Sequence, residues 1–409
     1  MTVKKIMQIF RDTAYVRTGG SAEELKCAEY LVSKCAEIGV EAKILPFKVD
    51  MAEMRRAELY IDGKPTACRG YLLCGSGEAE AEIYYLRNTD AYSLSQCRGK
   101  IVMLDGYLGY WTYQDIVDNG AVGFITYSGN ANYSDSEIDL RELRSYVSNG
   151  RKILGVNINA KSAISIINGG AKTAKIVIEQ DEHEGESRNV VAEIKGETDE
   201  TVVFTAHYDS TFLSQGAYDN MSGSVGILAA AEYFAKNPPR CSLRFIWCGS
   251  EERGLLGSKA YTASLSEEEL KKIVLNINLD MIGCIMGRFI ACCSAEEKLV
   301  HYIEYFAAQR GFGISARTGV YSSDSTPFAD KGVPSLSFAR LAPENTATIH
   351  NSYDTLKVMN GRQMAKDIDF IVAFAESMAN GAKCPVGREI PEDVKKKLDY
   401  YLFREREKK

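Results

Sequence analysis

Side chains of the kinds that bind metal ions stand at the ends of several hydrophobic runs in the second half of the chain. His207 and Asp209 end the run TVVFTAHYD, and Glu251 and Glu252 follow the run SLRFIWCGS. Asp280 ends a third run, IVLNINLD. Such runs predict a sheet in which functional residues gather at the carboxyl ends of the strands. We therefore expect these five side chains to converge.

Two further candidates lie in predicted loops, Asp219 in QGAYDNMSGS and His350 in TIHNSYDT. Histidine nitrogens and carboxylate oxygens are ligands that zinc accepts, and one carboxylate can bridge two metal ions about 3.5–4 Å apart. His207 and Asp209 are two residues apart in an extended segment, so their side chains point the same way. Asp209 is therefore expected to orient the imidazole of His207.

The adjacent glutamates favour a division of roles. Two consecutive carboxylates do not easily bind one metal ion in the same way, so we expect Glu252 to be a ligand and Glu251 to be a free base. The chain has only 4 histidines, and two of them fall within the acid-rich motifs. The other two, His183 in a charged linker and His301 on a predicted helix, are expected to be structural.

The elements that must position these residues alternate between strand and helix after Arg188. Helices are expected at 224–236, around Tyr261 and at 296–310. This alternation predicts an α/β fold with a mostly parallel sheet flanked by helices. An earlier helix is predicted from Ser21 to Gly39, with Ser21 and Glu24 as a capping box and Gly39 as a left-handed C-terminal cap.

Composition and charge limit the classes of partner. The chain has 409 residues and a net charge of −6, without the clustered positive charge that nucleic acid or an anionic membrane would require. No apolar run approaches the roughly 18 residues that would span a bilayer. The first ten residues do not read as a signal peptide. Its 11 cysteines show no paired spacing and suit buried thiols in a reducing compartment, so a cytoplasmic location is expected.

Together the motifs resemble those of the zinc aminopeptidase family of peptidase clan MH, which also includes glutamate carboxypeptidases and the non-catalytic transferrin-receptor ectodomains. The resemblance covers H-x-D at His207, D-N-x-S-G from Asp219, E-E from Glu251 followed by G-L-L-G-S, and N-x-D-M ending at Met281. It also covers the last histidine, His350, before the sequence YDT. The order and spacing of the motifs agree with the family, and its zinc exopeptidase fold is implied.

The resemblance implies two Zn²⁺ ions per chain, with cobalt or manganese as substitutes. Each residue would take the following role: His207 and Asp280 bind one ion, Glu252 and His350 bind the other, Asp219 bridges both, Glu251 is the general base and Asp209 orients His207. The segment SSDSTPFADKGVPSLSF resembles the family's stretch before its last ligand. Many members carry histidine where this chain has Ser325.

The sequence between Tyr60 and Glu186 has a different texture, with short β-type runs such as GKIVMLDGY and glycine-bearing turns. It resembles a protease-associated domain inserted at residues 60–186, which implies a discontinuous peptidase domain at 1–47 and 188–383. Residues 385–409 are predicted to contain a charged helix that packs back on the chain through Leu398, Tyr401 and Leu402.

The expected activity is hydrolysis of the N-terminal peptide bond of peptides by a metal-bridged hydroxide. Glu251 would take the proton from water and deliver it to the departing amine. Tyr321 is a candidate for stabilising the oxyanion. Arg340 could instead bind a substrate carboxylate, which would favour a carboxypeptidase or dipeptidase. A non-catalytic binding ectodomain is the third reading. The related glutaminyl cyclases use one zinc ion with fewer ligands, and the presence of both His207 and Asp280 speaks against that variant. Oligomeric state is not predicted.

Overall fold

The computed structural model describes residues 1–104, 106 and 108–406. It divides into two compact units, one made of residues 1–47 and 186 onward and the other of residues 48–185. Strands β1 (Ala42–Ile61) and β8 (Thr173–Ile194) each continue from one unit into the other. Asp105 and Tyr107 of the predicted strand run GKIVMLDGY, and residues 407–409 of the predicted C-terminal segment, lie outside the described residues.

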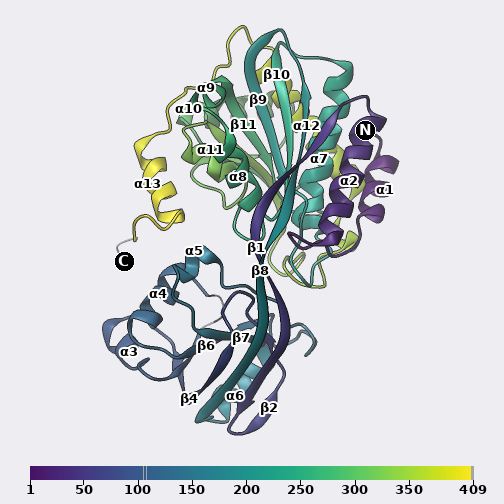
Figure 1. The fold of residues 1–409 in the computed structure, drawn as a ribbon. Helices are drawn as coiled ribbons and strands as arrows, with labels where there is room; N and C mark the ends of the chain where they lie inside the picture. Colours follow the sequence, from purple (N-terminus) through teal and green to yellow (C-terminus); the bar gives the residue numbers. More distant parts are fainter. Residues whose placement is uncertain (105, 107, 407–409) are drawn as a thin grey trace. The chain divides into compact units, whose positions relative to one another are not determined.

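The first unit contains a sheet with helices on both faces (Figure 1). Its strands besides β1 and β8 are β9 (Thr198–His207), β10 (Cys241–Cys248), β11 (Ile273–Leu279), β12 (Arg288–Ser294), β13 (Ser315–Thr318) and β14 (Ser335–Leu341). Its helices are α1 (Val3–Asp12), α2 (Ala22–Glu37), α7 (Ser222–Lys236), α8 (Leu256–Ser264), α9 (Glu267–Lys272), α10 (Glu297–Gln309), α11 (Ser325–Asp330), α12 (Gly361–Ala379) and α13 (Glu392–Tyr401). Two short helical turns, η1 (Ala217–Met221) and η2 (Leu356–Val358), lie in its loops.

The strands of this unit follow the order β13-β12-β14-β11-β9-β10-β8. Strand β9 pairs in parallel with both β10 and β11, and β14 pairs in parallel with β11. Strand β13 is parallel to β12, whereas β8 and β12 pair antiparallel with β10 and β14. The predicted mostly parallel α/β sheet is therefore confirmed.

The apolar runs reflect burial on both faces of this sheet. Phe204 of β9 belongs to the larger core, which also contains buried side chains of α1, α2, α7, α10 and α12. Its neighbour Val203 points to a second core that contains Tyr261 of α8 and Phe328 of α11. Because successive side chains of a strand alternate between faces, a strand covered on both sides must be apolar throughout.

Helix α2 begins at the predicted place, but one predicted contact is wrong. Ser21 accepts a hydrogen bond from the backbone N–H of Glu24 at 3.1 Å, and Gly39 has a φ of +77° after the helix end, as predicted. The Glu24 side chain does not return to the backbone of Ser21 to complete a capping box. Its carboxyl group accepts hydrogen bonds instead from Gly20 N, Ser187 Oγ and Ser250 N, which the tertiary structure brings close to it.

Helix α13 packs against α11 within the first unit. Val394 and Leu398 are buried together with Ala329 of α11. Arg404, just after the helix, forms two hydrogen bonds at 2.6 and 2.7 Å to the carboxylate of Asp330. Of the predicted docking residues, Leu398 is buried, while Tyr401 and Leu402 are partly exposed.

The second unit has its own core, and its strands continue from β8 in the same hydrogen-bonded order. Its elements are β2 (Lys64–Thr66), β3 (Arg69–Gly70), β4 (Gly77–Leu86), α3 (Ala91–Ser95), β5 (Ile101–Leu104), α4 (Tyr110–Asp118), β6 (Gly123–Ser128), α5 (Ser145–Ser148), β7 (Leu154–Asn159) and α6 (Ala160–Asn168). Strands β4, β5, β6 and β7 pair in parallel in that order. The protease-associated assignment of this region stays a prediction.

The cysteines and the lengths of the helices bear on two expectations drawn from the sequence. All 11 cysteines are free thiols, and every one except Cys68 is buried. Among the described residues, none of the helices combines the length and the apolar character needed to cross a membrane.

Candidate metal centre

The predicted polar residues meet at one edge of the first unit's sheet. Strand β9 ends at His207, which is in register with Cys248 at the end of the parallel strand β10. Strand β11, parallel to β9 on its other side, ends at Leu279, directly before Asp280. Because neighbouring parallel strands end at the same edge, residues distant in sequence become neighbours in space.

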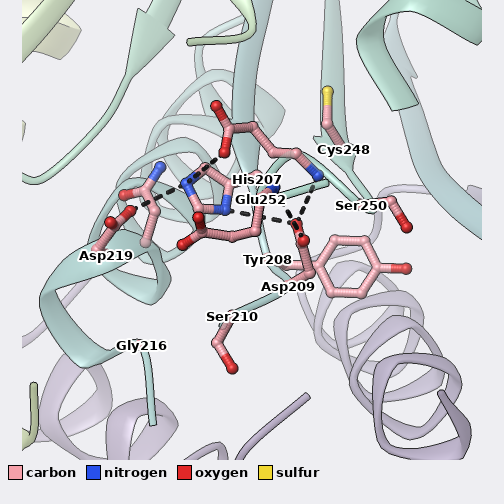
Figure 2. Close-up of polar contacts among 12 residues, drawn as sticks. His207, Tyr208, Asp209, Ser210, Gly216, Asp219, Cys248, Ser250 and Glu252 are labelled. Atoms are coloured by element: carbon pink, nitrogen blue, oxygen red, sulfur yellow. Dashed lines mark hydrogen bonds and ion pairs between the residues drawn. The ribbon is translucent and has the colours of Figure 1, made fainter. Parts of the chain in front are cut away.

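The Nε2 atom of His207 faces three carboxyl groups. This atom is 3.1 Å from Asp219 Oδ1, 3.8 Å from Glu251 Oε2 and 3.9 Å from Asp280 Oδ1. Figure 2 shows the ring of His207 between Asp219 on one side and Asp209 on the other. The second ring nitrogen, Nδ1, is 3.5 Å from Asp209 Oδ1 but has no hydrogen-bond partner among the described residues, so the orienting role of Asp209 stays a prediction. His207 and Asp209 are both buried.

His350 approaches the same carboxylate from the opposite side. Its Nε2 atom is 3.1 Å from Asp219 Oδ2 and 3.1 Å from Glu252 Oε2. The side chain of His350 is 48% exposed, whereas that of His207 is 1% exposed, so the cluster is open to solvent on the His350 side. The donor atoms are therefore reached from solvent on that side.

The described residues contain three groups of candidate donor atoms; one consists of His207, Glu251 and Glu252, and the other two share Asp219. Of these two, His207, Asp219 and Asp280 form the first, and Asp219, Glu252 and His350 form the second. Within each group the candidate donor atoms lie within 4.8 Å of one another. Asp219 uses Oδ1 in the group with Asp280 and Oδ2 in the group with His350, which is the geometry that a bridging carboxylate requires.

The surroundings of the cluster shift the protonation of its carboxyl groups. Burial raises the pKa of Glu251 well above its ordinary range, against the influence of His207. Burial likewise raises the pKa of Asp280 to about 7. Burial acts in the same direction on Asp219, but hydrogen bonds with His207 and His350 hold its pKa below the ordinary range.

This donor set fits divalent zinc. Buried carboxylates that lie side by side repel one another unless a cation compensates them. Asp280 Oδ1 is buried and accepts no hydrogen bond from the described part of the chain, so it is available as a ligand. Two imidazoles and three carboxylates offer only nitrogen and oxygen donors, both of which zinc accepts.

Comparison with known proteins shows that the segment containing the site matches a protein family. Residues 189–375 match the model of peptidase family M28, and every predicted site residue falls within that segment. This segment is a peptidase M28 domain.

Two curated relatives of the M28 domain are aminopeptidases. Aminopeptidase YwaD of Bacillus subtilis (strain 168) is 33% identical over 192 residues, which are 45% of this chain and 42% of that protein. An aminopeptidase of Pseudomonas aeruginosa (strain UCBPP-PA14) is 46% identical over 107 residues, which are 26% of this chain and 20% of that protein. The chain thus aligns with less than half of the length of these relatives.

A solved structure extends the likeness of the fold. BSAP, described as a zinc aminopeptidase from Bacillus subtilis, has a TM-score of 0.77 and 25% sequence identity, covering 96% of this chain and 98% of that chain. The α/β fold predicted for the M28 domain is therefore that of a zinc aminopeptidase structure.

Asp209 has a second role in the M28 domain that the sequence did not reveal. Its Oδ1 accepts a hydrogen bond from the backbone N–H of Glu251 at 3.0 Å, and its Oδ2 accepts one from Glu252 N at 3.2 Å. Figure 2 draws the contact between Asp209 and Glu252 beside the one between Asp209 and His207. Asp209 therefore holds the backbone of the loop after β10.

Two neighbours of the site residues were not predicted to be functional. The buried Asp354 accepts hydrogen bonds from Tyr218 N at 2.8 Å and Asp219 N at 3.0 Å. Asn220 accepts one from Met281 N at 3.1 Å and donates one to Leu279 O at 2.9 Å, which ties the Asp219 loop to the end of β11. Both residues lie inside the motifs that carry the family resemblance, and this position in the sequence could have identified them as functional.

Arg17 supports the same loop from outside the matched segment. Its guanidinium is fully buried and donates to the carbonyl oxygens of Tyr208 and Gln215, each at 2.5 Å, and of Gly216 at 2.8 Å. Two further bonds go to carbonyls of its own segment, at Thr13 and Tyr15. No sequence signal marked this arginine.

The weaker candidates differ in their surroundings. The hydroxyl of Tyr321 is buried without a hydrogen-bond partner among the described residues. Burial, followed by the charges of Asp280 and Asp219, raises the pKa of this phenol, so the group stays neutral beside the cluster. Ser325 stands where many members of the family that this chain resembles carry histidine. Its hydroxyl is hydrogen-bonded to that of Ser337 at 2.8 Å.

Arg340, the candidate for binding a substrate carboxylate, is already paired. Its Nε and Nη2 atoms donate to the two carboxylate oxygens of the buried Asp367 at 2.8 and 2.6 Å. Its Nη1 donates to Gly287 O at 2.7 Å. A guanidinium that already forms a two-point contact with one carboxylate is poorly suited to bind a second.

Proposed function

We propose that this protein is a zinc-dependent aminopeptidase that holds two zinc ions in the M28 domain. The single observation that carries the proposal is the pair of donor groups joined by the two oxygens of Asp219. The relatives named above are aminopeptidases, and the similar solved structure is described as a zinc enzyme.

The proposed ligands follow from the two groups that share Asp219. His207 and Asp280 would hold one ion, Glu252 and His350 would hold the other, and Asp219 would bridge them. Bound zinc would lower the pKa of a water molecule toward about 7 and polarise the carbonyl of the scissile bond.

Glu251 is the proposed proton carrier. Its carboxyl faces His207 Nε2 at 3.8 Å, whereas Glu252 faces His350, so the two neighbours serve different sides of the cluster. Glu251 would accept a proton from the attacking water as the carbon–oxygen bond forms. It would then transfer that proton to the amine nitrogen as the carbon–nitrogen bond breaks. The raised pKa of Glu251 suits a group that must hold the proton between the two steps.

Other residues of the chain would support this step. Asp209 holds the backbone of the two glutamates and would also orient the imidazole of His207, whose Nδ1 lies 3.5 Å away. Tyr321 is proposed to donate its hydroxyl proton in a hydrogen bond to the oxyanion, because that hydroxyl is buried near the cluster.

Amino-terminal specificity is favoured over carboxy-terminal specificity. The pairing of Arg340 with Asp367 removes the cation that had suggested a carboxypeptidase or dipeptidase. A binding ectodomain is disfavoured because a protein without catalysis has no need for the whole donor set together with Glu251. A cytoplasmic location and peptide substrates are proposed on the grounds given by the sequence.

The test combines metal analysis with hydrolysis of aminoacyl chromogenic substrates, for the wild-type protein and Glu251→Gln. We expect about two zinc ions per chain, activity that a chelator abolishes, and no activity on substrates with an acetylated amine. Glu251→Gln should keep its zinc and lose about 10²–10⁴-fold in kcat. Zinc without aminoacyl hydrolysis would favour the carboxypeptidase alternative, and absence of bound zinc would contradict the site.

A further inference from the structure

Two buried carboxyl groups hold three consecutive backbone N–H groups after strand β10. Asp209 accepts from Glu251 N and Glu252 N at 3.0 and 3.2 Å. Glu24, from helix α2, accepts from Ser250 N at 3.1 Å. Ser250, Asp209 and Glu252 are drawn together in Figure 2. Glu24 is fully buried and lies outside the segment that matches the M28 family.

Ser250 needs such support because of its backbone conformation. Its φ is +53°, in the left-handed region that residues other than glycine adopt rarely. A backbone of this kind persists where surrounding contacts over-determine it. Ser250 Oγ donates to Ser187 Oγ at 2.8 Å, and Ser187 Oγ donates to Glu24 Oε1 at 2.7 Å. The backbone N–H of Ser250 thus reaches the carboxyl group of Glu24 directly, and its hydroxyl reaches the same group through Ser187.

The start of helix α2 presses against the same turn. A Cβ atom added to Gly19 would lie 2.8 Å from Ser250 Cα, closer than real Cβ atoms come to other atoms. Arg253 Nη1 donates to Gly19 O at 3.4 Å. Glu24 Oε2 accepts from Gly20 N at 2.9 Å, so one side chain joins the N-terminal segment to the turn.

The position of Glu24 is not explained by the needs of its own helix. Ser21 already caps α2 by accepting from Glu24 N. A buried carboxyl group costs free energy unless it is well hydrogen-bonded, and Glu24 obtains two of its three bonds from Ser187 and Ser250, far along the chain.

We infer that Glu24 is a positioning residue for Glu251, acting by holding the Ser250 turn from the N-terminal helix. The inference rests on the proposed function of Glu251 as the proton carrier. Asp209 would still hold Glu251 N and Glu252 N without Glu24, so zinc binding should survive its loss. The carboxyl group of Glu251 would be less well placed, and a misplacement of about 1 Å can lower turnover by about 100-fold.

The test compares Glu24→Ala, Glu24→Gln and a control, Leu31→Ala. Leu31 is fully buried on the same helix but belongs to the main core, so its truncation weakens α2 without touching the turn. Each variant is measured for kcat and KM on an aminoacyl substrate, for zinc per chain, and for hydrogen exchange of the backbone amides at 249–254.

For Glu24→Ala we expect kcat to fall by about 10–100-fold, with KM within about twofold and zinc content unchanged. Exchange at 249–254 should become faster. Glu24→Gln keeps an oxygen that can accept from Ser250 N and should regain most of the kcat. Leu31→Ala should leave kcat and the exchange of this segment as in the wild type, although its melting temperature falls.

Three results would overturn the inference. They are normal kcat and exchange in Glu24→Ala, equal losses in Leu31→Ala, or no rescue by Glu24→Gln. If Glu24→Ala does not fold, Ser187→Ala decides, because it removes one of the two paths from Ser250 to Glu24 and should speed exchange at 249–254. If the wild type does not hydrolyse aminoacyl substrates, the proposed function fails while the exchange measurement still reports on the turn.

Discussion

Asp219 Oδ2 lies 3.1 Å from Nε2 of His350, although the two residues come from separate loops of the chain. The other oxygen of Asp219 faces His207 at the same distance. One carboxylate between two imidazoles joins the donor groups into a single site, and the predictions that follow depend on this arrangement.

Removal of one imidazole should separate the two proposed metal positions. His350→Ala leaves His207, Asp219 and Asp280 intact, so we expect zinc to fall from about two ions to about one per chain and kcat to fall by at least about 100-fold. His301→Ala is the control, because His301 is exposed on α10 near Glu304. Metal analysis that found two ions in His350→Ala would contradict the ligand assignment.

Asp354 should matter for zinc affinity although it is not a proposed ligand. Asp354→Asn can no longer accept from both Tyr218 N and Asp219 N with carboxylate strength, which loosens the bridging residue. Loss of a group that orients a ligand typically costs about 10–100-fold in metal affinity. Competition with a chelator measures this change. Asp90→Asn, at the exposed N-terminus of α3, should leave the affinity unaltered.

Arg340 should contribute to stability and not to substrate selection. Arg340→Met leaves the buried Asp367 without its partner, and such a loss costs about 3–5 kcal/mol of unfolding free energy. Urea unfolding checks the value. Lys397→Met removes an exposed ion pair with Asp393 and should cost less than about 1 kcal/mol.

The same variant separates two functions. KM for a peptide with a free C-terminal carboxylate and KM for its amide should change equally in Arg340→Met. A rise of KM for the free acid alone would restore the carboxypeptidase reading.

Glu24 should make stability depend on pH. Burial raises the pKa of Glu24 to about 8, against the hydrogen bonds from Ser187 and Gly20. Because the folded state then binds the proton more tightly than the unfolded state, the contribution to stability is complete below the ordinary pKa near 4.5. That contribution is lost as the pH rises through about 8.

Melting temperatures of the wild type, Glu24→Gln and Leu31→Ala between about pH 5 and pH 9 test this sign. Glu24→Gln cannot titrate, so its melting temperature should gain on that of the wild type as the pH rises. Leu31→Ala should lie below the wild type by a constant amount. A constant difference for Glu24→Gln as well would mean that Glu24 does not titrate in this range.

The chemical character of the site could be predicted from the sequence. His207, Glu251, Glu252 and Asp280 follow apolar runs, and parallel strands that are buried on both faces must be apolar and must end at one edge. The residue types at those ends then specify nitrogen and oxygen ligands. The mostly parallel sheet and helices α2, α7 and α10 follow from the same patterns of burial.

The hydrogen-bond partners of the other buried polar groups, such as Glu24 and Arg340, were decided by the tertiary structure alone. Glu24 fits a capping box by its spacing from Ser21, yet its carboxyl group accepts from Ser250 N, and the backbone N–H of Ser21 that a capping box would use donates to Thr18 O at 3.0 Å. The sequence favoured a structural role for Arg340 over binding of a substrate carboxylate, and only the folded chain shows that Asp367 is its partner. Local spacing determines which element a residue joins, but a buried hydrogen bond depends on which distant segment comes within about 3 Å, and that is a property of the folded chain.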